Sequence, residues 1–141
     1  VGGYRAIFVY GWEEPELAMR LFVSGKCIRF DSRVVIEHNH RMTKDAGRLP
    51  GEYDYLYARN IVWAHTLNLM LGVGLGVGIA RSFRFTLGAN RRRLAALRGL
   101  CSGVTGTFLH WSKRQPASLH DTRRWLKYER RCHQSAKGRS T

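Results

Sequence analysis

The run Glu13-Glu14-Pro15-Glu16 places three carboxylates within about one helical turn. A carboxylate held at the edge of a cleft can act as a general base, taking the proton of a hydroxyl group as that group attacks. The alternative is structural, because the backbone N–H groups and the dipole at a helix N-terminus favour acidic side chains whatever the function. The residues alone leave both interpretations open.

A second group that could do chemistry is Glu37-His38-Asn39-His40, at the end of an extended segment. Two histidines at i and i+2 lie on the same side of a strand, where both rings can ligate one metal ion. Two histidines do not complete a metal site, so the spacing predicts at most part of one. The alternative is a surface histidine beside a carboxylate.

The segments around these residues predict mixed α/β structure. We expect a helix from Pro15 to Ser24, because proline suits the first turn of a helix and Gly25 suits the left-handed position after the last turn. Apolar residues recur on one face of this helix. Short extended segments are expected at 26–30 and 33–37. A helix followed so closely by strands indicates a mixed sheet covered by helices.

Residues 60–80 carry no charged side chain and are long enough to cross a bilayer. Polar groups in the first half argue against a span, because they are costly in hydrocarbon. We expect instead a helix from Tyr53 to Leu71, either buried or lying on a membrane, and then a flexible glycine-rich segment. The polar residues are Asn60, His65, Thr66 and Asn68.

The rest of the chain alternates basic clusters with aliphatic residues. Helices are expected at 91–98 and, capped by Asp121, at 122–132, with a turn-rich stretch at 99–106 between them. These patterns divide the chain into three parts. We expect a catalytic α/β part at 1–54, a helical, basic and membrane-associated part at 55–132, and a flexible tail at 133–141.

The formal net charge of +14 is concentrated in one part of the chain. Residues 1–54 hold eight acidic and eight basic residues, whereas residues 55–141 hold sixteen basic residues against two acidic ones. Such an excess is typical of a protein with an anionic partner, whether nucleic acid, a membrane surface or a phosphate-bearing substrate. Cys27, Cys101 and Cys132 form no CxxC pair, and we expect reduced thiols in a cytosolic protein.

The order of motifs in residues 1–60 resembles glycosyltransferase family 2, whose enzymes have the GT-A fold. The shared pattern is a Gly-Gly-aromatic entry, an acidic pair followed by an acidic residue and leucine, an Arg-Leu pair, a glycine and a strand ending in histidine. An aromatic-x-Arg-Asn sequence then opens the next helix in bacterial members. Here these motifs read Gly2-Gly3-Tyr4, Glu13-Glu14-Pro15-Glu16-Leu17, Arg20-Leu21, Gly25, Val34-Val35-Ile36-Glu37-His38 and Tyr57-Ala58-Arg59-Asn60.

This resemblance implies the acceptor-side, C-terminal portion of an inverting glycosyltransferase, with part of a GT-A mixed sheet followed by a mainly helical basic region. Glu14 lies at the position of the catalytic base, where aspartate is usual, so the assignment stays open between Glu14 and Glu13. Glu16 either supports the helix start or binds an acceptor hydroxyl. Trp12 either stacks on a sugar face or packs in the core, and Arg59 takes part in substrate binding.

The resemblance also implies a metal ion and a set of partners. His38, with His40 as the fallback, matches a histidine that in some members helps hold a divalent ion, Mg²⁺ or Mn²⁺. The ion neutralises the departing nucleoside diphosphate while Glu14 takes the acceptor's proton. The partners would be a nucleotide-sugar donor, a glycan or lipid-linked acceptor and an anionic membrane surface. The expected setting is polysaccharide or cell-wall synthesis, in the cytoplasm or on the inner face of the plasma membrane.

In that family the donor-binding half, with its Asp-x-Asp motif, precedes this region, so we expect an upstream segment and no turnover by this chain alone. Two non-catalytic alternatives remain. A nucleic-acid-binding module explains the cluster Arg91–Arg93 but not the balanced charge of the first forty residues, and we do not expect nucleic acid as the partner. A membrane-associated domain would be built on residues 60–80 and their basic flanks.

Overall fold

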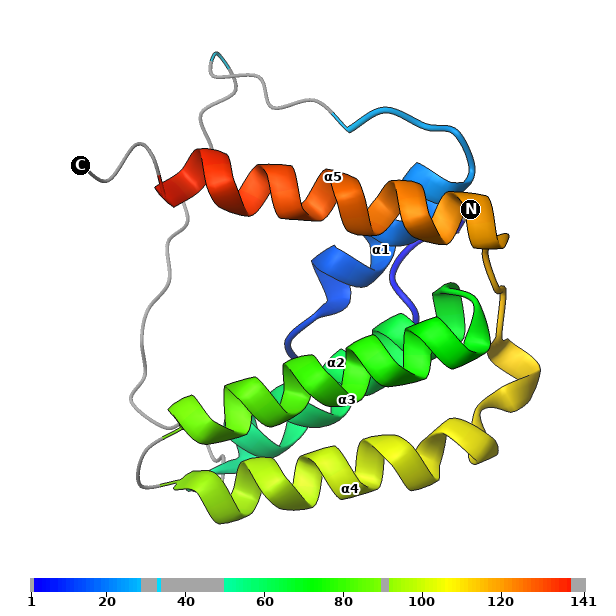
Figure 1. Cartoon of the computed structure of the whole chain (residues 1–141). Helices are drawn as coiled ribbons and strands as arrows, with labels where there is room; N and C mark the ends of the chain where they lie inside the picture. The colour runs from blue at the N-terminus through cyan, green and yellow to red at the C-terminus, as the bar shows by residue number, and fades with distance from the viewer. Residues whose placement is uncertain (1, 29–32, 34–49, 90–91, 138–141) are drawn as a thin grey trace.

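The structure, a computed structural model, describes residues 2–28, 33, 50–89 and 92–137, with side chains up to Arg131. The described residues form five α-helices, whose arrangement Figure 1 shows, and a short 3-10 helix before α5. In chain order these are α1 (Glu13–Val23), α2 (Glu52–Asn68), α3 (Leu71–Gly88), α4 (Arg93–Leu109), η2 (Trp111–Lys113) and α5 (Leu119–Lys137).

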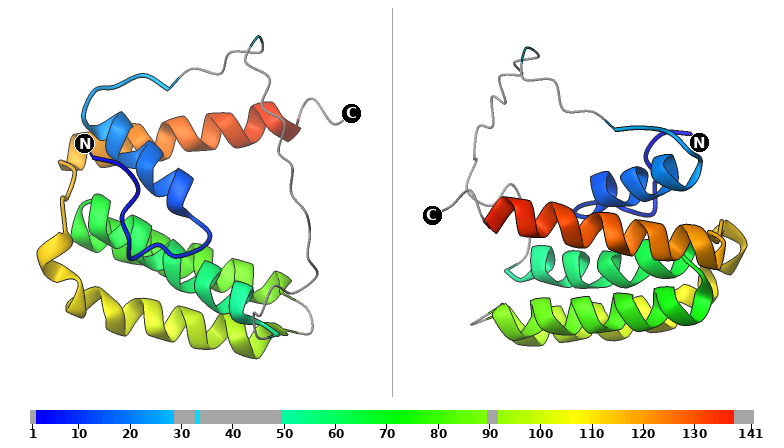
Figure 2. Two further views of the ribbon diagram at one scale, coloured as in Figure 1. Left: turned by 180° about the vertical axis from the view of Figure 1, so that it is seen from behind. Right: turned by 45° about the horizontal axis from the view of Figure 1, so that its top comes forward.

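Helices α2, α3 and α4 form a tight three-helix unit with α2 at its centre. Helices α3 and α4 pack against α2 and against each other, whereas α1 contacts α2 and α5. Figures 1 and 2 show α1 between α5 and this three-helix unit, with α4 on the side of the molecule opposite α5. Helix α2 is thus the centre of the fold, and its residues from Asn60 to Asn68 are all buried.

The prediction of an α/β fold is wrong, because the part of the chain that the structure describes contains no β-strand. The apolar surfaces of these helices pack on other helices rather than on a sheet. Of the predicted strands at 26–30 and 33–37, only residues 26–28 and 33 are described, and none of them pairs as a strand. The resemblance to family 2 is therefore not supported, because the residues that the structure describes form a helical bundle without the sheet of a GT-A fold.

The uncharged stretch at 60–80 forms a helical hairpin. Leu69 and Met70 have extended backbone, so the chain reverses there between α2 and α3. The glycines after Leu71 lie within α3 and do not form the flexible segment that the sequence predicted. Within the described ranges, no helix has the length and apolar character needed to cross a membrane.

Glycines allow α3 and α4 to approach α2 closely. In α3, Gly74 and Gly78 face α2, and in α4 Gly99 and Gly103 do the same. A Cβ atom on Gly99 would lie 2.1 Å from the backbone oxygen of Tyr55, so no larger residue fits without moving the helices apart. Small residues four apart allow this kind of contact between helix backbones. The turn-rich stretch predicted at 99–106 is therefore a helical packing face.

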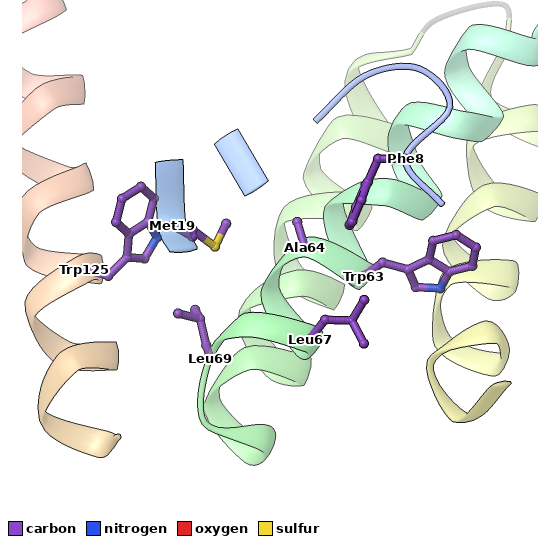
Figure 3. Close-up of a cluster of buried hydrophobic side chains, with 7 residues drawn as sticks. All are labelled: Phe8, Met19, Trp63, Ala64, Leu67, Leu69 and Trp125. Atoms are coloured by element: carbon purple, nitrogen blue, oxygen red, sulfur yellow. The ribbon is translucent and has the colours of Figure 1, made fainter. Parts of the chain in front are cut away.

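The hydrophobic core lies between α1, α2 and α5, with the N-terminal segment closing one side (Figure 3). Its buried members are Phe8, Met19, Trp63, Ala64, Leu67, Leu69 and Trp125. The start of α5 is capped by Ser118, whose hydroxyl accepts a hydrogen bond from the backbone N–H of Asp121 at 3.0 Å. The carboxylate of Asp121 in turn accepts a hydrogen bond from the hydroxyl of Ser118 at 2.7 Å. The cap predicted at Asp121 is therefore a reciprocal pair of residues that begins at Ser118.

Candidate functional site

The acidic residues singled out in the sequence begin α1, directly after a sharply bent loop. Helix α1 starts at Glu13, two residues before the predicted start at Pro15. Gly11 and Trp12 both have left-handed backbone, with φ of 78° and 71°. Trp12 is the only residue other than glycine with a positive φ among the residues that the structure describes. A bulky side chain in this conformation is strained, and such strain is concentrated at functional sites.

Helix α2 holds this loop in place through two adjacent side chains. The amide nitrogen of Asn60 donates hydrogen bonds to the backbone oxygens of Tyr10 at 2.9 Å and Gly11 at 2.8 Å. The guanidinium of Arg59 lies 4.3 Å from the ring centroid of Trp63 and donates to the backbone oxygen of Ile7 at 3.5 Å. Arg59 thus contacts the N-terminal segment, and its role in substrate binding stays a prediction.

The two candidate bases lie at the first two positions of α1. Glu14 is exposed, and Glu13 is half-buried with its Oε2 atom enclosed and without a hydrogen-bond partner in the structure. The helix dipole stabilises a negative charge at both positions. Glu14 can therefore meet a substrate hydroxyl from solvent, whereas the unpaired Oε2 atom of Glu13 is closed to solvent.

Glu16 is separated from this surface although it lies only two residues from Glu14. Its side chain is 0% exposed. Its carboxylate accepts two hydrogen bonds from Arg20, at 2.8 and 2.9 Å, and lies 3.1 Å from Nη1 of Arg5. Asn68 adds a donor at 3.2 Å. The predicted contact between Glu16 and an acceptor hydroxyl is not available here, because these groups occupy the carboxylate and tie α1 to α2.

Aromatic rings lie beside the acidic pair. Trp12 is half-buried, with its ring centroid 6.2 Å from that of Tyr57 and 5.1 Å from that of His65, so it packs against the core. The more open ring is Tyr53, which is 41% exposed. Tyr53 lies 5.4 Å from Tyr10 and 5.3 Å from Tyr57, as measured between ring centroids.

Sequence reasoning missed Tyr53 as a site residue. The available signal was the spacing of four between Tyr53 and Tyr57, which places both rings on one face of α2. The sequence could not show that this face meets the loop before Glu13. That juxtaposition depends on the contacts that Asn60 makes with Tyr10 and Gly11, about fifty residues away in the chain.

The surroundings of Tyr53 raise the pKa of its hydroxyl. Burial is the main cause that raises the pKa of Tyr53 above its ordinary value, followed by Tyr57 and Tyr10 and then by the negative charges of Asp54 and Glu13. The Tyr53 phenol therefore stays protonated and can both donate and accept a hydrogen bond. The carboxylate of Glu13 is thus close enough to raise the pKa of Tyr53. We call the neighbouring rings of Tyr10, Tyr53 and Tyr57 the tyrosine face.

The metal site predicted from the histidines is not tested by the structure. His38 and His40 lie outside the described residues. Among the residues that are described, no group of three or more His, Cys, Asp or Glu side chains could hold a metal ion. Glu13 and Glu14 alone do not complete a coordination sphere, so these residues do not fit a resident divalent ion.

A cavity of about 350 Å³ lies elsewhere, near the C-terminal end of α1, where it is lined by Arg20, Val23, Ser24, Asn68 and Gln115. The acidic pair does not line this cavity. Comparison with protein-family profiles, curated proteins and solved structures found no match to this chain.

Proposed function

We propose that this chain supplies the acceptor side of an enzyme that transfers a sugar from a nucleotide-sugar donor to a hydroxyl group. The observation that carries the proposal is the acidic pair Glu13-Glu14, of which Glu14 is exposed, directly after a strained loop that α2 anchors. The rings of Tyr10, Tyr53 and Tyr57 lie next to one another beside this loop. A strained loop held by two partly buried hydrogen bonds is costly unless its geometry serves a purpose.

The side chains at this surface suit a sugar hydroxyl. A pyranose ring has an apolar C–H face that packs on an aromatic ring, and its hydroxyl groups hydrogen-bond to carboxylates. Tyrosine offers both an apolar ring and a polar hydroxyl at the wet edge of a site. Tyr53 is the exposed ring, and Glu13 lies within electrostatic range of it.

In the proposed reaction Glu14 is the general base. Its carboxylate takes the proton of the acceptor hydroxyl while the hydroxyl oxygen forms a bond to the anomeric carbon of the donor. The bond from that carbon to the nucleoside diphosphate breaks, and the diphosphate leaves with the electron pair. A single displacement of this kind inverts the anomeric configuration. A positioned base contributes about 10²–10⁴-fold to the rate of such a step.

The proposal assigns the donor and any divalent ion to groups outside the described residues. A divalent ion, when present, neutralises charge on the departing diphosphate. The residues described here bind and deprotonate the acceptor, and Asn60 and Arg59 hold the loop that aims the base. These roles do not require a GT-A sheet.

Acceptor binding by the chain itself tests the proposal. We expect saccharides titrated into the chain to shift the ring resonances of Tyr53 and the backbone resonances of Glu13 and Glu14 in NMR spectra. Tyr53→Ala should weaken this binding by about tenfold or more, as expected when an aromatic contact is lost. Tyr128→Ala is the matched control, since Tyr128 is 43% exposed on α5 and also packs against aromatic rings.

The control variant should bind saccharide as the wild-type chain does. Equal loss in the two variants would show a general effect of removing a tyrosine. If no saccharide shifts the resonances around Glu13 and Tyr53 at millimolar concentration, the acceptor site is not here and the proposal fails.

A further inference from the structure

The corner where α3 ends and α4 begins exposes large apolar side chains. Phe83 and Leu87 lie on the last turns of α3, and Leu94 and Leu97 lie on the first turns of α4. Their side chains are between 44% and 63% exposed. Helices α3 and α4 pack against each other, and the four residues lie where α3 ends and α4 begins. Large apolar side chains exposed together at the ends of two packed helices mark an interaction surface.

Arginines are interleaved with these apolar residues. Arg84, Arg93 and Arg98 are exposed on the same turns, and none of them has an acidic partner within the described part of the chain. The sequence contains no acidic residue between Asp54 and Asp121, so neither α3 nor α4 carries a negative side chain. This corner is therefore both apolar and positively charged.

We propose that this corner docks on the surface of an anionic lipid bilayer. The apolar side chains of Phe83, Leu87, Leu94 and Leu97 would enter the boundary between headgroups and acyl chains, while the arginines contact lipid phosphates. Interfacial helices bind membranes through this combination of apolar area and basic charge. The inference stands apart from the proposed sugar transfer, because it uses none of the residues of that site.

A bilayer fits this corner better than a nucleic acid does. Binding to a nucleic-acid backbone uses phosphate contacts and gains little from exposed leucines. The outer face of α5 offers a contrasting case, with exposed Arg123, Lys127 and Arg130. The exposed apolar residues described on this helix are Leu119, at its first position, and Tyr128. Figure 1 places α5 on the side of the molecule opposite α4, so the two basic surfaces can be tested separately.

Flotation with lipid vesicles tests this proposal on the full chain at low salt. We compare neutral phosphatidylcholine vesicles with vesicles containing phosphatidylglycerol. The wild-type chain should float with the anionic vesicles only. The corner charge variant, with Arg84→Gln, Arg93→Gln and Arg98→Gln, should bind about a hundredfold more weakly, because each basic residue near the surface contributes about fivefold. All three side chains are exposed, so the fold should survive the change.

Two further variants separate the proposal from its rivals. The α5 variant Arg123→Gln, Lys127→Gln, Arg130→Gln removes the same charge and should bind within about twofold of wild type. The apolar variant Leu87→Gln, Leu94→Gln keeps every charge and should lose at least tenfold. Equal losses in the two charge variants, wild-type binding by the apolar variant, or binding to an RNA or DNA oligomer without binding to vesicles would each overturn the proposal.

Discussion

Three neighbouring carboxylates, Glu13, Glu14 and Glu16, have different environments. Glu16 is buried against Arg5, Arg20 and the amide of Asn68. Glu14 is exposed, and Glu13 is half-buried. The sequence marks all three as one acidic group. The difference follows from helix geometry, because Glu16 points towards α2 while Glu14 points away from it.

Only part of this arrangement could be predicted from the sequence. The pairing of Glu16 with Arg20 was readable, since residues four apart face each other on a helix. The contacts of Glu16 with Arg5 and Asn68 were not, because they join separate elements. The roles of Glu13 and Glu14 remain predictions, whereas Glu16 is explained by packing.

His65 gives a prediction at the residue scale. It is buried in α2, where its Nδ1 lies 2.7 Å from the backbone oxygen of Ile61 and its Nε2 has no partner. Burial lowers the pKa of His65 to about 4, and Arg81 acts in the same direction, while the Ile61 oxygen and Glu129 oppose the shift. The folded state therefore keeps the ring neutral at pH values where the unfolded chain already binds a proton.

Because the folded pKa lies below the unfolded value of about 6.5, this stability is full above pH 6.5 and is lost as the pH falls towards 4. The loss should be about 3 kcal/mol in the free energy of unfolding. His65→Leu should remove this part of the pH dependence, because it has no titrating group. Urea denaturation from pH 7 to pH 4 checks the prediction, and an unchanged pH dependence in the variant would contradict it.

At the scale of the elements, local sequence patterns predicted most of the helices but not how the helices pack. The helices expected at 15–24, 53–71, 91–98 and 122–132 all lie largely within helices of the structure. Their apolar faces did not reveal whether a sheet or other helices would cover them. The error over the glycine-rich segments has a related cause, because glycine weakens an isolated helix.

In this fold the glycines at the α2 interface allow contacts that no other residue could make. The contrast between Gly99 and Gly76 shows this. A Cβ atom on Gly99 would meet the backbone oxygen of Tyr55, whereas a Cβ atom on Gly76 would meet nothing within 4 Å. The position of a glycine relative to α2 therefore decides whether it is needed, and the sequence does not give that position.

This contrast gives a prediction at the element scale. Gly99→Ala should destabilise the chain by about 1–3 kcal/mol, because α2 and α4 must separate to admit the methyl group. Gly76→Ala is the matched control and should stabilise the chain by about 0.5–1 kcal/mol through its helix propensity. Urea denaturation of both variants measures the difference. Equal changes in the same direction would show that close helix contact does not govern these positions.

At the scale of the whole molecule, the candidate site lies at the same end of the bundle as the corner where α3 ends and α4 begins. The ring of Tyr57, on α2, lies 4.6 Å from that of Phe85, on α3, as measured between centroids. Arg92, just before α4, lies 3.8 Å from the carboxylate of Asp54. The tyrosine face beside Glu13 is therefore next to the helix ends that carry Phe83, Leu87, Leu94 and Leu97.

This arrangement connects the two proposals. A chain docked through the corner would hold its acidic pair near the headgroup region of a bilayer, where a lipid-linked hydroxyl is within reach. The sequence predicts a glycan or a lipid-linked acceptor, and the proposed docking would suit the lipid-linked one. The two proposals still fail separately, since vesicle binding and saccharide binding are measured on different residues.

The most direct test of the central claim is the turnover of the natural protein that carries this chain, with variants of the acidic pair. We predict that Glu14→Gln lowers kcat by about 10²–10⁴-fold and leaves the donor KM near wild type, because only the proton acceptor is lost. Glu13→Gln should cost far less, and Glu14→Asp should keep part of the activity because it keeps a carboxylate. If Glu13→Gln alone abolishes turnover, Glu13 is the base. If both glutamine variants turn over as the wild type does, the acidic pair only stabilises the start of α1, and the catalytic claim is contradicted.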